Sequence, residues 1–279
     1  MEQITKPHQL REYSLTQKRQ GERIALVPTM GALHEGHLSL IKKAQEYTPL
    51  VIVSIFVNPT QFGPGEDFES YPRQIEEDLN RLEDLEVSVV YTPGRQDMYP
   101  SHFSTKIHVS NISEGLCGST RPGHFDGVAT VVTKLLNQSQ ADWGIFGEKD
   151  YQQLCVIKRL VKDLDIPCKI IGSPIIRDKH GLALSSRNAY LSPNGLSSAR
   201  QLNRILKQAA IDIGQGKDIS ETLTHSREKT LQAGFDKVDY LELREEETLI
   251  PVTNISRRAM RLLVAACIGQ TRLIDNIRV

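Results

Sequence analysis

The sequence predicts an α/β protein: a Rossmann-like, doubly wound parallel sheet followed by a second, smaller α+β C-terminal domain. Over the first two-thirds of the 279 residues, short apolar segments alternate with amphipathic ones, a rhythm typical of parallel strands joined by helices. Segment 50–57 is almost continuously apolar, as expected of a strand covered on both faces. The pattern changes after Ile176, so we expect one domain at 1–176 and a second at 177–279.

In the first domain we expect each short apolar segment to form a strand, and each segment with an apolar stripe at helical spacing to form a helix. The helix after the first strand carries such a stripe from Leu40 to Tyr47. The expected strands are 24–27, 50–57, 87–91, 143–146 and 169–171, and the other expected helices are 75–85, 128–136 and 151–164.

In the second domain we expect a helix over 198–213, because Leu202, Leu206 and Ala209 form an apolar stripe along it. Three stretches that favour β-structure follow, and the link between the last two indicates a tight hairpin turn at 269–271. These stretches are 238–243, 262–268 and 271–274.

The composition limits the kinds of partner. Lys+Arg and Asp+Glu balance at 34 each, so no global field attracts nucleic acid or an anionic membrane, and any anion site must be local. No apolar run approaches the ~20 residues that span a bilayer, and the N-terminus lacks the apolar core of a secretory signal. The four cysteines are scattered without a C-x-x-C pair, which favours reduced thiols in a cytoplasmic protein.

The run 28–37 follows the first predicted strand and opens a helix with His34 and His37 three residues apart. Histidines at this spacing share one helical face, and the N–H groups and dipole at a helix start favour anions. Gly31 and Gly36 remove side chains where a bulky ligand would approach the backbone. Together these groups suit a nucleotide triphosphate whose α-phosphate is attacked.

Other interpretations of this run must be weighed. Taken alone, two such histidines are more often surface residues or core spacers. Zinc is disfavoured because the metalloprotease pattern H-E-x-x-H has its histidines one residue further apart. The chain contains no P-loop motif, which excludes that type of phosphate site.

Two further loops carry polar side chains at strand and helix ends. A proline ends the second strand, so we expect Asn58 and Gln61 at the same sheet edge as the histidines, where amides can bind hydroxyl and carboxylate groups. The glycine-bearing segment 63–68 is expected to act as a lid. Arg121 and His124 precede a predicted helix and can hold a carboxylate or a phosphate. Each motif alone is equally typical of an ordinary loop.

Two more loops add positive charge. After the fourth strand, Gly147 allows a ligand close to the backbone, and Lys149 brings a mobile cation. Asp150 and Gln153 lie about one helical turn apart and suit a ribose or a small substrate. Beyond the proposed boundary, the Ser-Ser-Arg sequence at 185–187 can grip β- and γ-phosphates, since guanidinium matches phosphate oxygens.

These loops, in this order, resemble the pantoate–β-alanine ligase family almost end to end. The histidine motif is similar to the H-x-G-H signature of the wider nucleotidylyltransferase and class I tRNA-synthetase superfamily, and 185–187 is similar to its second signature loop. The matching segments are 28–37, 58–62, 121–128, 146–154, 185–188 and the C-terminal 271–276.

The resemblance implies an AMP-forming carbon–nitrogen ligase of pantothenate (vitamin B5) and coenzyme A biosynthesis. (R)-Pantoate would attack the α-phosphate of ATP to give pantoyl adenylate and pyrophosphate, and β-alanine would then displace AMP to form pantothenate. ATP is implied as a substrate with Mg²⁺, and no organic prosthetic group is implied. The family is typically a cytoplasmic homodimer, and we expect no nucleic-acid or membrane partner.

The resemblance also implies residue roles, with His37 as the family's proton donor and Glu77 and Asp78 as candidate magnesium ligands. The implied catalytic set is His34, His37, Lys149 and Arg187. The implied ATP site comprises Met30, Gly31, Ala32, Leu33, His34, Glu35, Gly36, His37, Gly147, Glu148, Lys149, Asp150, Ile176, Leu184, Ser185, Ser186 and Arg187. Pantoate and β-alanine would be held by Asn58, Gln61, Arg121, His124 and Gln153.

Two other functions stay open at this point. A nucleotidylyltransferase of the same fold would leave the nucleotide on its product, whereas a ligase releases AMP. Gln61, Gln153 and the loop 121–127 favour the ligase. A nucleotide-binding regulatory protein would have lost charged site residues, and the sequence shows no such loss.

Overall fold

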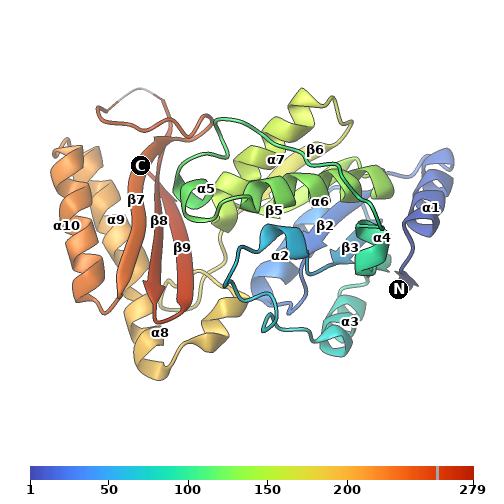
Figure 1. Cartoon of the computed structure of the whole chain (residues 1–279), viewed down its shortest axis with the longest axis horizontal. Coiled ribbons are helices and arrows are strands. Elements are labelled where there is room, and N and C mark those ends of the chain that lie inside the picture. The colour runs from blue at the N-terminus through green and yellow to red at the C-terminus, as the bar shows by residue number, and fades with distance from the viewer. Residues whose placement is uncertain (256–257) are drawn as a thin grey trace.

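The computed structural model describes residues 1–255 and 258–279. Within these ranges, six parallel strands form the central sheet of the larger region, with helices on both faces (Figure 1). This confirms the predicted Rossmann-like, doubly wound sheet. The strands are β1 (Glu2–Ile4), β2 (Ala25–Thr29), β3 (Val51–Ile55), β4 (Val89–Tyr91), β5 (Trp143–Gly147) and β6 (Lys169–Ser173).

The strand order is β1-β4-β3-β2-β5-β6. From β2 the chain builds toward one edge through β3 and β4, and then adds β5 and β6 on the other side of β2. The order therefore reverses between β2 and β5, which pair in parallel with Ala25 beside Trp143. In open α/β sheets, ligands bind at such a switch point, outside the carboxyl ends of the strands.

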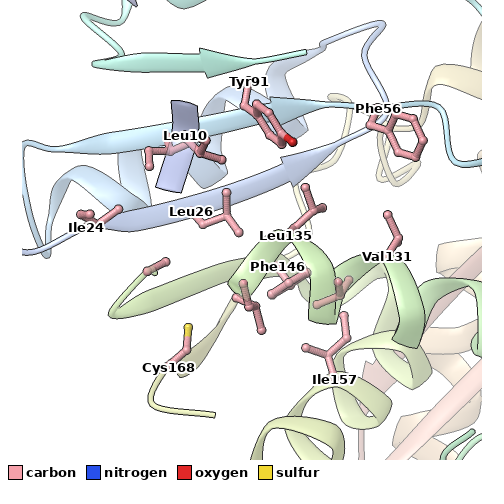
Figure 2. Packing of buried hydrophobic residues seen from close by; sticks show 14 of the residues in the cluster. Leu10, Ile24, Leu26, Phe56, Tyr91, Val131, Leu135, Phe146, Ile157 and Cys168 are labelled. Atoms are coloured by element: carbon pink, nitrogen blue, oxygen red, sulfur yellow. The ribbon is translucent and has the colours of Figure 1, made fainter. Parts of the chain in front are cut away.

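Helices cover both faces of this sheet. They are α1 (Pro7–Arg19), α2 (Glu35–Gln45), α3 (Ile75–Asp84), α4 (Arg95–Met98), α5 (Leu116–Thr120), α6 (His124–Ser139) and α7 (Tyr151–Asp163). Leu26 and Ile52 pack with α1, α6 and α7 on one face (Figure 2). Val27 and Val53 pack with α2 and α3 on the other. Because successive strand residues enter opposite cores, the strands read as continuous apolar runs.

The C-terminal region is a three-stranded antiparallel sheet with helices packed against it, at the left of Figure 1. Its elements are α8 (Pro193–Ala199), α9 (Gln201–Gly214), α10 (Ile219–Gln232), β7 (Lys237–Glu245), β8 (Met260–Ile268) and β9 (Thr271–Arg278). Helix α9 packs against β9, and α10 packs against β7. Ile268 pairs with Thr271 across the β8–β9 hairpin, which confirms the predicted tight turn.

Helix α10 is absent from the sequence prediction because small polar residues occupy most of its buried positions, while its apolar core contacts, Ile219 and Leu223, stand only near its start. Thr222, Ser226 and Thr230 are buried. Their hydroxyls donate to the carbonyl oxygens four residues earlier, at 2.7, 2.7 and 2.8 Å. Each hydroxyl therefore has a hydrogen-bond partner within its own helix, so these three positions can be buried without being apolar.

The helices α1, α4 and α5 are also absent from the sequence prediction, and further differences lie at element ends. The predicted helix over 198–213 is divided, because α8 ends at Ala199 and α9 begins at Gln201. Helix α8 starts earlier than predicted, where Ser192 accepts a hydrogen bond from the Gly195 amide and caps the helix. Strand β1 also escapes prediction, since a three-residue strand shows no periodicity.

A third apolar cluster joins the two regions. Phe125 and Val156, from α6 and α7, pack with Tyr240 and Leu263, from β7 and β8. The two sheets therefore share part of their core, and the division into domains at Ile176 stays a prediction.

Two expectations from composition bear on the whole chain. Among the residues described, no helix is both long enough and apolar enough to cross a membrane. All four cysteines lie in the described ranges and are free, which confirms the prediction of unpaired thiols.

Candidate active site

A cavity of about 230 Å³ lies at the switch point between β2 and β5. His37, Lys149 and Arg187 all line it, although they come from α2, from the turn η2 (Glu148–Asp150) and from the turn η3 (Ser186–Tyr190). The cavity continues into a cleft of about 940 Å³ between the two regions, because both are lined by Arg121, His124, Lys149, Asp150, Gln153, Ser185 and Arg187. The structure thus brings the predicted loops together around one space.

Most of the predicted site residues belong to the wall of this cavity. Five residues of the predicted ATP set, all within the described ranges, lie outside the wall: Gly31, Ala32, Leu33, Glu35 and Glu148. The predicted residues in the wall are Met30, His34, Gly36, His37, Asn58, Gln61, Arg121, His124, Gly147, Lys149, Asp150, Gln153, Ile176, Leu184, Ser185, Ser186 and Arg187.

The turn after β2 is closed by a carboxylate from α3. The amides of Ala32 and Leu33 donate to the two oxygens of Asp78 at 2.9 and 2.7 Å. Gly31 has φ +83°, and a Cβ there would lie 3.0 Å from the Asp78 carboxylate. In this structure the chain's own carboxylate lies against these amides and Gly31, and the place of 31–33 in an ATP site stays a prediction.

His34 and His37 form a stacked pair at the start of α2, with ring centroids 4.1 Å apart. His34 is the N-cap residue, and its Nδ1 accepts from the Gly36 amide at 3.1 Å. The Nδ1 of His37 faces the His34 amide at 3.4 Å. Because both Nδ1 atoms act as acceptors, the neutral rings carry their protons on Nε2.

The cap formed by His34 requires a glycine at position 36. A Cβ at Gly36 would lie 2.7 Å from the His34 ring, so a side chain there would displace the cap. The glycine therefore makes room for the His34 ring, and it also belongs to the cavity wall; the predicted clearance for a ligand stays a prediction.

Burial lowers the pKa of both imidazoles. The pKa of His34 falls to about 4 and that of His37 to about 3, with Lys149 adding to the burial effect at both rings. Near neutral pH both rings are therefore uncharged in the ligand-free site. His37 can donate a hydrogen bond from its neutral ring, and its implied role as a proton donor stays a prediction.

The turn η2 presents Lys149 and Asp150 to the cavity directly after β5. The Lys149 ammonium lies 3.2 Å from the Asp150 carboxylate. Burial alone would raise the pKa of Asp150, but Lys149 and Arg187 outweigh it and hold this pKa below its usual value. The site therefore contains an ionised pair beside two neutral imidazoles.

Two carboxylates of the predicted lid pair with the two arginines of the cavity. Glu66 accepts from Arg121 at 2.7 and 2.6 Å, and Asp67 accepts from Arg187 at 2.9 and 2.7 Å. Both pairs are bidentate, the geometry in which guanidinium and carboxylate match best. The glycines of 63–68 lead us to expect a lid, but no sequence pattern predicts these pairings, because they join residues far apart in the chain.

His124 is held in one tautomer by partners that allow no other. Its Nδ1 donates to the Gln61 carbonyl oxygen at 2.8 Å, and its Nε2 accepts from Arg121 at 3.0 Å. Burial and the neighbouring Arg121 lower the pKa of His124 to about 4. His124 therefore supports the backbone at Gln61, beyond its place in the cavity wall.

Asn58 holds the Gln61 side chain in place by a hydrogen bond. Its amide group donates to Gln61 Oε1 at 3.0 Å and to the Gly127 carbonyl oxygen at 3.2 Å. Its own oxygen accepts from the Tyr99 hydroxyl at 2.8 Å. Gln61 then points its nitrogen toward the Met30 sulfur at 3.1 Å, which places its amide at the cavity wall.

The candidate magnesium ligands do not fit that role. Both oxygens of Asp78 accept backbone amides and its side chain is buried, while Glu77 is exposed on α3. Neither belongs to the cavity wall. Within 1–255 and 258–279, no three His, Cys, Asp or Glu side chains gather in a group that could hold a metal ion.

The cavity also has an apolar side, whose residues are not among the predicted site residues. Val131 and Leu135 of α6 line it together with Phe56 and Phe146 at the ends of β3 and β5. Tyr71 also lines the cavity, with the Arg187 guanidinium 5.8 Å from its ring centre. An apolar helix face predicts burial, but no sequence pattern distinguishes the part that faces a cavity from the part that faces a strand.

Comparisons with known proteins agree along the whole chain. A family model described as pantoate-beta-alanine ligase matches residues 2–278. A pantothenate synthetase from Chelativorans sp. (strain BNC1) is 53% identical over 262 residues, which cover 94% of this chain and 92% of that protein. A relative with the same name from Mesorhizobium japonicum is 52% identical, with the same coverage.

Solved structures are also similar. The crystal structure of pantothenate synthetase from Thermus thermophilus covers 99% of both chains with a TM-score of 0.92 and 41% identity. A pantoate-beta-alanine ligase from Francisella tularensis, described as complexed with beta-gamma ATP and beta-alanine, has a TM-score of 0.85 and 39% identity. It covers 100% of this chain and 97% of that one.

We expect the free energy of unfolding to fall as the pH is lowered from about 7 to about 5. The three histidines of the cavity stay neutral in the fold, with pKa values lowered from 6.5 to about 3 or 4. The unfolded chain, in contrast, takes up protons once the pH passes below 6.5, so stability is lost in that direction. Urea unfolding at a series of pH values measures the slope.

His124→Asn removes one of these groups and should flatten this slope. His225→Asn, at an exposed position of α10, is the matched control and should leave the slope as it is. Equal slopes for both variants would contradict a neutral, buried His124.

Proposed function

This chain belongs to the pantoate–β-alanine ligase family, and we propose that its cavity joins pantoate to β-alanine by way of an enzyme-bound pantoyl adenylate. The observation that carries the proposal is the convergence of His37, Lys149 and Arg187 on one cavity at the switch point of the sheet. An imidazole, an ammonium and a guanidinium, carried on side chains of different length, can donate hydrogen bonds to different oxygens of one triphosphate, whose charge is spread over many oxygens.

In the first step, a carboxylate oxygen of pantoate attacks the α-phosphorus of ATP. A new O–P bond forms, the bond from the α-phosphorus to the bridging oxygen breaks, and pyrophosphate leaves with the electron pair. Lys149 and Arg187 stabilise the charge that develops on the phosphates. The Nε2–H groups of His34 and His37 donate hydrogen bonds to phosphate oxygens, as neutral imidazoles can do.

In the second step, the amine of β-alanine, having lost a proton to water, attacks the acyl carbon of the adenylate. The C–N bond forms, the acyl C–O bond to the phosphate breaks, AMP leaves with the electron pair of that bond, and the nitrogen gives up its second proton to water. Gln61 and Gln153 hold the reacting groups in the cavity, and Asn58 and His124 keep Gln61 in place. Such positioning converts encounters in solution into a reaction between fixed neighbours.

Pantoate has two kinds of surface, and the cavity has a matching side for each. Its hydroxyl and carboxylate groups can bind the amides of Gln61 and Gln153. Its two methyl groups can pack against the apolar side formed by Val131, Leu135 and Phe146. Burial of these methyl groups favours pantoate over smaller hydroxy acids by about 0.8 kcal/mol for each carbon.

The lid carboxylates serve as internal counter-ions before substrate arrives. Asp67 holds Arg187, and Glu66 holds Arg121, in the geometry that a phosphate or a carboxylate of the substrates would use. ATP must therefore displace Asp67 to reach Arg187. The lid is thereby coupled to substrate binding.

Three further properties remain proposals. We propose that Mg²⁺ arrives with ATP as part of the substrate, and no step above depends on a protein ligand for it. The homodimer and the cytoplasmic location rest on the resemblance to the family, and the scattered free cysteines agree with a reducing compartment.

We expect ATP–pyrophosphate exchange to require pantoate but not β-alanine, because the adenylate forms before the amine takes part. Exchange of labelled pyrophosphate into ATP measures this step directly. AMP should appear only when β-alanine is added. Exchange without pantoate would defeat the proposal, and a product that retains the nucleotide after β-alanine is added would favour a simple nucleotidylyltransferase.

We expect Lys149→Ala and His37→Ala to lower turnover by ~10²–10³-fold, the usual scale for one group that stabilises developing charge. Steady-state rates of pantothenate formation measure the effect. Lys158→Ala, on the exposed face of α7, is the control and should keep the parent rate. Near-normal turnover in both cavity variants would remove their proposed roles.

We expect Asp67→Asn to bind ATP about 5-fold more tightly, because a partly exposed ion pair of ~1 kcal/mol no longer competes for Arg187. Isothermal titration calorimetry with MgATP measures the affinity. Glu69→Gln, an exposed carboxylate in the same loop, is the matched control and should bind as the parent does. Weaker binding by Asp67→Asn would show instead that Asp67 supports the nucleotide.

A further inference from the structure

The end of β9 reaches across to the turn η2, which presents Lys149. The Nδ2 of Asn276 donates to the carbonyl oxygen of Glu148 at 2.9 Å and to that of Lys149 at 3.1 Å. Asn276 is only 2% exposed, so water does not compete for these bonds. A single side-chain amide from the C-terminal region thus holds two successive peptide groups beside the cavity.

The orientation of this amide is set by Arg261 on β8. Arg261 Nη1 donates to Asn276 Oδ1 at 2.6 Å. A guanidinium can only donate, so Oδ1 must face Arg261 and Nδ2 must face the two carbonyl oxygens. Arg261 is itself buried and paired with Glu246 at 2.6 and 3.0 Å, which fixes its own position.

The same residues hold the other end of the turn. Tyr151 follows Asp150 and begins α7, and the Arg261 guanidinium lies 3.8 Å from the centre of its ring. The Tyr151 hydroxyl donates to the Glu246 carbonyl oxygen at 3.1 Å. The Lys149–Asp150 pair therefore lies between two points that the C-terminal sheet fixes.

We propose that Asn276 is a positioning residue for Lys149: through the two peptide carbonyls it fixes the turn from which the Lys149 ammonium reaches the phosphates. This rests on the proposed role of Lys149 in the adenylation step. Asn276 touches no substrate in this account and acts only through the backbone of η2. A displacement of about 1 Å at a reacting group can cost ~10²-fold in rate, so two hydrogen bonds at this turn are enough to matter.

Asn276→Asp tests the proposal with little change of shape. The variant keeps an oxygen for Arg261 but replaces the amide donor with an acceptor that faces two carbonyl oxygens. We expect the rate of pyrophosphate release in a single turnover to fall by ~10- to 10²-fold, with the KM for β-alanine unchanged. Asn276→Ala removes the donors without adding charge and should also slow this step.

A second substitution separates this role from general destabilisation. Leu206→Val lies in the core of the C-terminal region, on α9, and leaves every contact to η2 in place. It should lower the unfolding temperature while the rate of pyrophosphate release stays at the parent value. A loss of rate that follows stability alone across all three variants would overturn the proposal.

The double variant Lys149→Ala with Asn276→Asp tests whether Asn276 acts through Lys149. We expect Asn276→Asp to slow the Lys149→Ala enzyme by less than about 2-fold, because residues that act as a unit are not additive. A loss as large as in the parent enzyme would overturn the positioning role. If Lys149→Ala alone retained the parent rate, the proposed function of Lys149 would fail instead, so the two failures are distinguishable.

Hydrogen exchange gives a readout that does not depend on activity. We expect Asn276→Asp and Asn276→Ala to raise amide exchange in a peptide spanning 147–154, while peptides from α9 keep the parent rate. Unchanged exchange across 147–154 in both variants would show that the turn does not depend on Asn276, and would overturn the inference.

Discussion

The parallel pairing of β2 with β5 is the constraint on which the site depends. It brings the histidine turn and the η2 turn to one edge of the sheet, although more than a hundred residues separate them along the chain. The pairing is stabilised by side chains buried on both faces, such as Leu26 and Ile145. The buried pairing of β2 with β5 therefore determines how the two polar turns of the cavity lie relative to each other.

The ligand-free site balances its own charges. Arg121, Arg187 and Lys149 each have a carboxylate partner, and His37 is neutral. Such balance is required in a partly buried cavity, because an unpaired buried charge is costly. The charged groups of the cavity therefore have their partners within the chain itself.

Two residues of the C-terminal region contact the chain segments that carry cavity residues. Strand β9 completes an antiparallel sheet, and its residue Asn276 ends against the peptide groups that hold Lys149. Asp275 beside it forms a bidentate pair with Arg177, just after the cavity residue Ile176. Two neighbouring residues of one strand thus connect the smaller sheet to both sides of the cavity.

The sequence predicts β2 to β9, the helices α2, α3, α6, α7 and α9, and the loops that form the site, because strands buried on both faces, apolar stripes and glycine- or proline-bearing turns leave a local pattern. It does not predict the short strand β1 or the helices α1, α4, α5 and α10, nor α8 as a separate helix. Only the folded structure shows which groups are hydrogen-bonded to one another. Asp78 accepts from the amides after β2, Asp67 accepts from Arg187, and Asn276 donates to the carbonyl oxygens of η2. Periodicity reports which face of an element is buried and carries no information about its partner. The hydrogen-bond partners named here are far apart in the sequence, and they come within bonding distance only when the elements that carry them pack together.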